Sequence, residues 1–350
     1  MKRRLHILLI LVIEAVGLSA LLPADLYATM YRSRATGTWT ANTTWDRSVD
    51  GGLNWAAAGA GQFPSSTATD TVFVLAAHTV TMNGNPGNCR TLTVSGTITW
   101  TQARTTNVGV GGVGDLTLSG GTVSGSATGR LNVQGAFLVP VSTTSTVQRI
   151  TLTVTGATTV SGTLQFTTSA AGNKTFVGAI TVNSGASWTN TINEAITVRG
   201  GISNNGTFTA GTGTHTFNTN SQVISGSSPV SFGGNAAITG AITLTNNSAV
   251  SVAGNLTGSV AGSTWLNAAN SSLSVTGVLL NKGTLTATES PNTVTYSGAA
   301  QTVKATTYSN LVIAGSGAKT TTGVTVTDTL SRQGTATATA APTYQSNSVV

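Results

Sequence analysis

The chain has 350 residues, of which 7% are charged, 5% aromatic and 39% hydrophobic. The hydrophobic fraction excludes a disordered chain, and the shortage of Lys, Arg and Glu excludes a largely helical one, because these residues fill exposed helix surfaces. Thr outnumbers even the 42 Gly. β-Branched residues suit pleated strands and Gly suits tight turns, so the composition predicts an all-β protein with many short strands.

The formal net charge is +7, and the basic residues are scattered singly. Without residues 1–28 the chain keeps 13 basic and 7 acidic groups, a balance of +6. A nucleic-acid partner requires basic residues gathered on one surface, so no nucleic acid is expected. Weak attraction to acidic extracellular glycans or cell surfaces is the simpler consequence of this charge.

Residues 1–28 have the pattern of a cleaved signal peptide. Three basic residues (Lys2, Arg3, Arg4) precede the apolar run Ile7–Ile13, and small residues follow over Ser19–Ala28. Glu14 interrupts the run, so contact with a membrane is expected only through this leader. The pattern predicts a secreted, extracellular or cell-surface protein. Cys89, the single cysteine, excludes an internal disulfide and is expected to be a small buried apolar group.

Residues 29–105 contain most of the tryptophans and are expected to cap the core at its N-terminal end. Further strands are predicted where apolar residues and Thr alternate. In 91–100, for example, Leu92, Val94, Ile98 and Trp100 should face inward. The segment 150–156 repeats this pattern with Ile150, Leu152 and Val154, and Ser-Gly, Asn-Gly and Gly-Gly pairs mark the turns between strands.

A cassette of about 80 residues occurs twice in the C-terminal half. The copies open at Asn204–Ala210 and Asn281–Ala287, and matching positions carry Gly206 and Gly283, Phe217 and Tyr296, and Gln222 and Gln301. A tandem repeat of strand-forming units is typical of an elongated stack, in which each unit buries its apolar edge against the next.

An antiparallel sandwich also fits short strands, but the repeats and the lack of helical crossovers favour a parallel β-helix, or solenoid, over residues 106–350. The Trp-rich module would then close the N-terminal edge of its sheets. The second cassette runs on to Val350 with no polar capping segment, so we expect the solenoid to continue in a longer protein.

Two regions resemble known families. "GTWTANTTWD" (Gly37–Asp46), "TDTVFVLAAHTVTMNG" (Thr69–Gly84) and "CRTLTVSGTITW" (Cys89–Trp100) resemble the extracellular domain named for its eight glycines, although "LAAH" stands where such domains more often have Pro-x-Gly-His. The segments Asn173–Asn218 and Thr295–Thr320 resemble repeats of secreted surface proteins of the Bacteroidetes type, including haemagglutinin-like adhesins. The resemblance implies location and shape rather than catalysis.

Motifs that carry chemistry are few. Gly109, Gly111 and Gly114 form a G-x-G-x-x-G pattern, but a strand is expected after it, whereas a dinucleotide site requires a helix. The same stretch is one residue short of a calcium nonapeptide before Asp115 and occurs once, so no metal is assigned. His78 and His215 are expected to be solvated or hydrogen-bonded strand residues, and no cofactor is predicted.

A polysaccharide lyase or hydrolase is the enzymatic alternative, and it requires carboxylates brought together. After the leader the carboxylates are Asp46, Asp50, Asp70, Asp115, Glu194, Glu289 and Asp328. Asp46 and Asp50, the only near neighbours, are expected to be turn or loop residues. Thr-rich outer faces could also order water as ice-binding surfaces do, but their spacing in the sequence is irregular.

Trp39, Trp45 and Trp55 are the candidate glycan contacts, since indole rings stack on sugars, and core packing is the alternative role for them. No catalytic, cofactor or metal residue is assigned. We therefore expect a secreted or cell-surface structural or adhesive solenoid that binds surfaces or glycans without catalysis, with a carbohydrate-active β-helix enzyme as the alternative.

Overall fold

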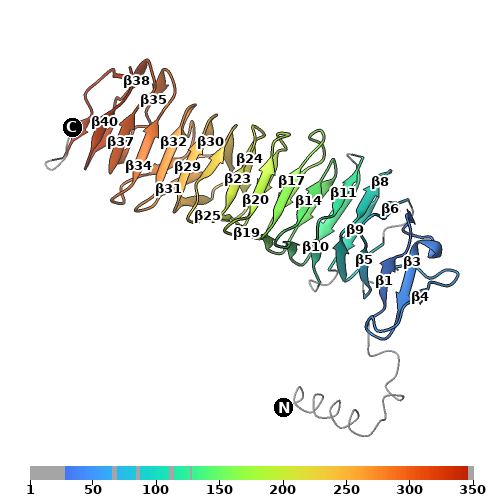
Figure 1. Ribbon diagram of the computed structural model, residues 1–350. Coiled ribbons are helices and arrows are strands. Elements are labelled where there is room, and N and C mark those ends of the chain that lie inside the picture. The colour runs from blue at the N-terminus through green and yellow to red at the C-terminus, as the bar shows by residue number, and fades with distance from the viewer. Residues whose placement is uncertain (1–27, 65–68, 84–86, 110–113, 127, 346–350) are drawn as a thin grey trace, which may run out of the picture.

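The computed structural model describes residues 28–64, 69–83, 87–109, 114–126 and 128–345, and its strands stack one after another along a rod (Figure 1). The N-terminal strands lie at one end and the C-terminal strands at the other. The predicted signal peptide lies outside the described residues except for its last position, as do Gly111 and the final five residues. An all-β fold built on parallel sheets is confirmed.

Three long sheets form the sides of the solenoid, and between residues 91 and 258 successive strands pass from sheet A to sheet B to sheet C. Sheet A contains β1 (Met30–Ser33), β3 (Trp45–Ser48), β4 (Ala56–Ala57), β5 (Thr71–Val74), β7 (Thr91–Val94), β10 (Leu116–Leu118), β13 (Phe137–Val139), β16 (Thr158–Val160), β19 (Ile180–Val182), β22 (Ile202–Asn204), β25 (Gln222–Ser225), β28 (Thr243–Asn246), β31 (Thr264–Asn267) and β33 (Thr284–Thr286).

Sheet B contains β2 (Gly37–Thr38), β6 (Thr79–Met82), β8 (Thr97–Trp100), β11 (Thr122–Gly125), β14 (Thr144–Val147), β17 (Thr163–Phe166), β20 (Ser187–Asn190), β23 (Thr207–Thr209), β26 (Val230–Phe232), β29 (Ala249–Val252), β32 (Ser272–Val275), β34 (Thr293–Tyr296), β37 (Asn310–Ile313) and β40 (Leu330–Arg332). Sheet C contains β9 (Thr105–Val108), β12 (Arg130–Val133), β15 (Thr151–Val154), β18 (Lys174–Phe176), β21 (Ile196–Val198), β24 (His215–Asn218), β27 (Ala236–Thr239) and β30 (Leu256–Gly258).

Two short sheets occupy the C-terminal end, where the sheet B strands continue but sheets A and C do not. Sheet D contains β36 (Thr307–Tyr308), β39 (Thr325–Val326) and β42 (Thr343–Tyr344). Sheet E contains β35 (Gln301–Thr302), β38 (Ala318–Thr320) and β41 (Thr337–Ala338). Near the opposite end, a 3-10 turn (Asn42–Thr44) precedes β3.

Coil length varies from turn to turn while the strands stay in register. Thr71 pairs with Thr91, an offset of 20 residues, whereas Leu92 pairs with Leu116, an offset of 24. Insertions therefore sit at the corners, where loops tolerate them, and the ladders of backbone hydrogen bonds continue across them. Sheets A and B run without a break through the boundary that the sequence placed between residues 105 and 106.

Alternating burial fills the core, as the sequence predicts. Leu92, Val94, Ile98 and Trp100 are buried while the Thr residues between them are partly exposed, and Ile150, Leu152 and Val154 follow the same rule. Inward residues of neighbouring coils stack on one another. On sheet C this stack comprises Val108, Val133, Val154, Phe176, Val198, Phe217 and Ile238. Each such side chain contributes about 1.5–3 kcal/mol on burial.

The Trp-rich region closes the N-terminal end of this core. Strand β3 pairs antiparallel with β1, and the two-residue β4 forms the outer edge of sheet A. Trp45 packs edge-to-face on Tyr31 and Trp39, with ring centroids 6.3 and 5.3 Å apart. Both indole N–H groups are satisfied, Trp39 by the Pro64 carbonyl and Trp45 by the Trp39 carbonyl. A short antiparallel edge above packed aromatics limits further strand addition.

The two cassettes form the same local structure on different sides of the rod. Phe217 lies in β24 of sheet C, whereas its counterpart Tyr296 lies in β34 of sheet B. The matching glutamines nevertheless make the same contact. The Gln222 side-chain amide donates a hydrogen bond to the Val198 carbonyl, and that of Gln301 donates to the Val275 carbonyl. The sequence repeat is thus not a whole number of coils, because a strand–turn unit with alternating burial fits any side.

Candidate functional site

A column of outward-facing residues, nearly all Thr or Ser, runs along sheet B and is called here the hydroxyl column. Each member pairs directly with the next across neighbouring coils. In chain order the column comprises Thr79, Thr97, Thr122, Thr146, Gln165, Thr189, Thr209, Ser231, Ser251, Ser274, Thr295, Val312 and Ser331. No member carries a charge, and all but Thr146 are at least partly exposed.

A second, parallel column extends the polar surface over part of the rod. Thr144, Thr163, Ser187 and Thr207 pair in sequence on sheet B, as do Ala249, Ser272, Thr293 and Asn310. These positions lie two residues before members of the hydroxyl column. Side chains therefore repeat about every 4.8 Å along the rod and about every 7 Å along a strand.

Neighbouring side chains of the hydroxyl column are close enough to bond each other. The Ser251 hydroxyl donates to that of Ser231 at 2.9 Å, and the Gln165 amide donates to the Thr146 hydroxyl at 3.2 Å. Each hydroxyl can still accept or donate elsewhere, since it offers one donor and two acceptor positions. The spacing of these residues in the sequence is irregular, as stated above, yet they align in space on this face, because the corners absorb the differences in coil length.

The three candidate glycan tryptophans do not share one environment. Trp39 and Trp45 are 1% and 0% exposed, so both fill the N-terminal core, the alternative role considered for them. Trp55 is partly exposed, and the Arg32 guanidinium lies 4.6 Å from its ring centroid. Its ring edge also meets Phe73. Of the three residues, only Trp55 presents ring surface to solvent.

The neighbouring carboxylates are held by other groups. Asp46 lies within strand β3 rather than in the expected turn, and it pairs with Arg32 at 3.1 Å. Asp50 does lie in a loop, where it accepts the Asn54 backbone and side-chain N–H groups and the Ser48 hydroxyl. These bonds, with the Asn54 backbone bond the largest cause, lower the pKa of Asp50 to about 2.

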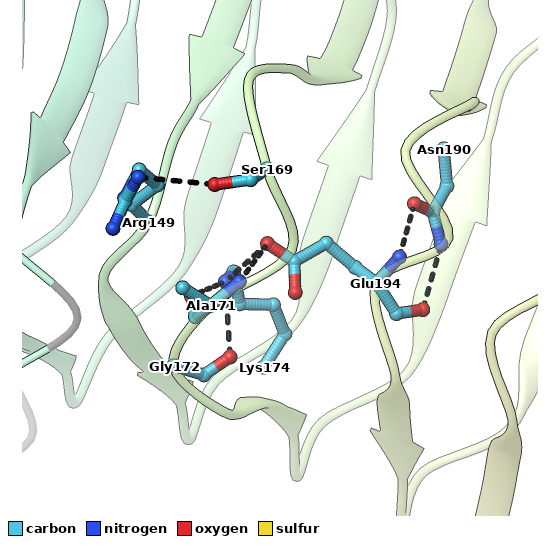
Figure 2. Close-up of polar contacts among 7 residues, drawn as sticks. All are labelled: Arg149, Ser169, Ala171, Gly172, Lys174, Asn190 and Glu194. Carbon is cyan, nitrogen blue, oxygen red and sulfur yellow. Dashed lines mark hydrogen bonds and ion pairs between the residues drawn. The ribbon is translucent and has the colours of Figure 1, made fainter.

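The interior contains a Lys–Glu ion pair that sequence reasoning missed (Figure 2). The Lys174 Nζ donates to the Glu194 carboxylate at 2.7 Å and to the carbonyls of Ala171 and Gly172 at 2.7 and 3.1 Å. The two side chains are 0% and 2% exposed. Burial lowers the pKa of Lys174, opposed by its hydrogen bond to Glu194 and the charge of that carboxylate.

Asn190 holds the turn that carries Glu194. Its side-chain oxygen accepts the Glu194 N–H at 2.9 Å, and its amide donates to the carbonyls of Glu194 and Ala210. All three Lys174 protons have acceptors, and the pair is closed to solvent. The pair therefore holds the corner loop 167–173 against the next coil. The sequence gives no signal of this role, because the partners are 20 positions apart.

His78 and His215 are both hydrogen-bonded, as expected, but only His215 lies within a strand. His78 follows a turn closed by its own N–H to the Leu75 carbonyl, and its Nδ1 lies 2.8 Å from the Ser33 hydroxyl. His215 is fully buried between the rings of Phe208 and Phe232, with Nδ1 3.1 Å from the Gly213 carbonyl and Nε2 without a partner. Burial lowers the pKa of His215 to about 4.

The remaining motifs have structural roles. Strand β10, not a helix, follows the Gly109–Gly114 segment, and Asp115 accepts the Ala136 N–H of the next coil at 2.8 Å. Cys89 is buried, and burial raises the pKa of its thiol. Within the described ranges no group of three or more His, Cys, Asp or Glu residues is arranged to hold a metal ion. No helix in the described part of the chain is long and apolar enough to span a membrane.

Comparison of the chain with known protein families, curated proteins and solved structures finds no match. The resemblances to the eight-glycine domain and to adhesin repeats therefore stay predictions. The turn at Leu75–His78 forms although its sequence departs from the pattern of that domain.

Proposed function

We propose that this protein is a secreted, non-catalytic adhesive rod whose sheet B face binds neutral surface polysaccharides. The observation that carries the proposal is the hydroxyl column, an uncharged row of paired Thr and Ser residues that continues from Thr79 to Ser331 with two exceptions, Gln165 and Val312. Hydroxyl side chains both donate and accept, which matches the hydroxyls of neutral sugars.

Binding along such a face depends on repetition. A single Ser or Thr contact contributes little, because it replaces a bond to water. When many equivalent contacts lie on one rigid rod, their binding free energies add, because translational entropy is lost only at the first contact. A long polymer therefore binds more tightly than a short oligosaccharide. The proposal therefore predicts binding that strengthens with polymer length.

Secretion is proposed on the signal-peptide pattern of residues 1–28. A glycan array probed with residues 29–350, followed by a reducing-sugar assay on the bound glycans, separates adhesion from hydrolysis. Binding to long neutral glycans without release of reducing ends supports the proposal. Release of sugar that disappears in Asp46→Asn or Asp50→Asn would support the enzymatic alternative instead.

A further inference from the structure

Three arginines gather at the corner where the chain passes from sheet B to sheet C. Arg130 opens strand β12, and it pairs with Thr105 of the preceding coil and Thr151 of the following one. Arg104 directly precedes Thr105, and Arg149 lies two residues before Thr151. Backbone bonds from Arg130 N–H to the Arg104 carbonyl and from Thr151 N–H to the Gly129 carbonyl, both 2.8 Å, fix the three coils together.

A hollow of about 370 Å³ lies on this corner. Its lining comprises Ala103, Thr105, Thr128, Arg130 and Thr151. One guanidinium and three threonine residues thus surround the space. Arg130 is exposed, and its five N–H donors suit bidentate contact with an oxyanion.

Two of the arginines of this corner, Arg104 and Arg149, have neutral side-chain partners. Arg104 donates to the Gln102 side chain at 3.3 Å, and Arg149 donates to the Ser169 hydroxyl at 3.1 Å. The ion pairs of Arg32 and Arg34 with Asp46 and of Lys174 with Glu194 lie elsewhere on the rod. The three arginines lie on successive coils, whose strands stack about 4.8 Å apart. Together they produce a local positive potential on an otherwise charge-poor rod.

We propose that this corner binds the acidic groups of an extracellular polysaccharide, with Arg130 in contact with a sulfate or carboxylate and the threonine hydroxyls as further donors. Arg104 and Arg149, on the coils either side, face neighbouring acidic groups of the same polymer. This inference rests on the proposed adhesive function for the class of polymer, but it concerns a different side of the rod and a charged ligand.

The test measures the affinity of residues 29–350 for dextran sulfate, polygalacturonate and uncharged dextran. Arg130→Gln should weaken binding to at least one of the acidic polymers about fivefold, and Arg130→Gln with Arg149→Gln about 20-fold, because each removes a charge-assisted hydrogen bond. The matched control is Arg332→Gln, which removes an exposed arginine at the far end of sheet B and should change the affinity less than twofold. Which acidic polymer responds identifies the sulfate or the carboxylate as the ligand.

Equal losses from Arg332→Gln and Arg130→Gln would overturn the site, because overall charge would then explain the binding. So would tighter binding to double-stranded DNA than to either acidic polymer, or no binding to an acidic polymer at all. Binding to dextran together with no effect of Arg130→Gln on either acidic polymer would contradict this inference and still support the hydroxyl column, so the two proposals fail separately.

Discussion

His215 should make the stability of the rod depend on pH between about 6.5 and 4. Its imidazole is fully buried between Phe208 and Phe232, and its Nε2 has no partner to share a proton. Burial lowers the pKa in the folded chain from 6.5 to about 4. The unfolded chain therefore takes up a proton first as the pH falls, which favours unfolding.

The size of the effect follows from the two pKa values. Above pH 6.5 the neutral imidazole costs the folded chain no stability. At pH 4 the stronger protonation of His215 in the unfolded chain lowers the free energy of unfolding by about 3 kcal/mol. His215→Val removes the titrating group, and Val294 shows that the second cassette accepts valine at the matching position, where it is buried in β34. The substitution also leaves a cavity, but the cost of the cavity does not depend on pH.

Urea unfolding of both proteins at several pH values between 7 and 4 measures the difference. The free energy of unfolding of the wild type should fall by about 3 kcal/mol more than that of His215→Val. A difference between the two proteins that stays constant within about 0.5 kcal/mol would refute the reasoning, since it would mean that His215 titrates alike in the folded and unfolded chains.

Three further predictions concern the core. Glu194→Gln leaves the buried Lys174 ammonium without its carboxylate and should lower the free energy of unfolding by about 3–5 kcal/mol in the same urea assay. The double variant Lys174→Met with Glu194→Gln should recover much of this loss, and no recovery would contradict the prediction. Gly87→Ala would place a Cβ 1.8 Å from the buried Trp39 Nε1 and should cost about 2 kcal/mol, against little for Gly59→Ala, whose nearest neighbour is the flexible Gln62 side chain. Burial raises the pKa of Tyr296 to about 12. The unfolded chain therefore loses this proton first as the pH rises, and the wild type should lose stability between pH 10 and 12 more steeply than Tyr296→Phe. Equal dependence of the two free energies of unfolding on pH would contradict this prediction.

The sequence predicts which residues of a strand face inward better than it predicts which residues pair between neighbouring coils. Alternation in 91–100 and 150–156 identifies the inward residues correctly, because burial on a strand depends only on period two. Which residues meet between coils depends on the length of each coil, which is 20 residues at Thr71–Thr91 and 24 at Leu92–Leu116. The hydroxyl column and the Lys174–Glu194 pair both arise from that alignment, so neither is visible in the sequence. The side on which each cassette lies is hidden for the same reason.

Binding of neutral polysaccharide by sheet B is the central claim, and charge placed on that face tests it most directly. Thr189→Lys with Thr209→Lys puts two long cations on the hydroxyl column, while Thr175→Lys with Thr197→Lys makes the same change in outward-facing positions of sheet C on similar coils. Affinity for long dextran should fall about tenfold or more in the first variant and less than twofold in the second. Equal affinity in both variants, or a greater loss in the sheet C variant, would contradict the account.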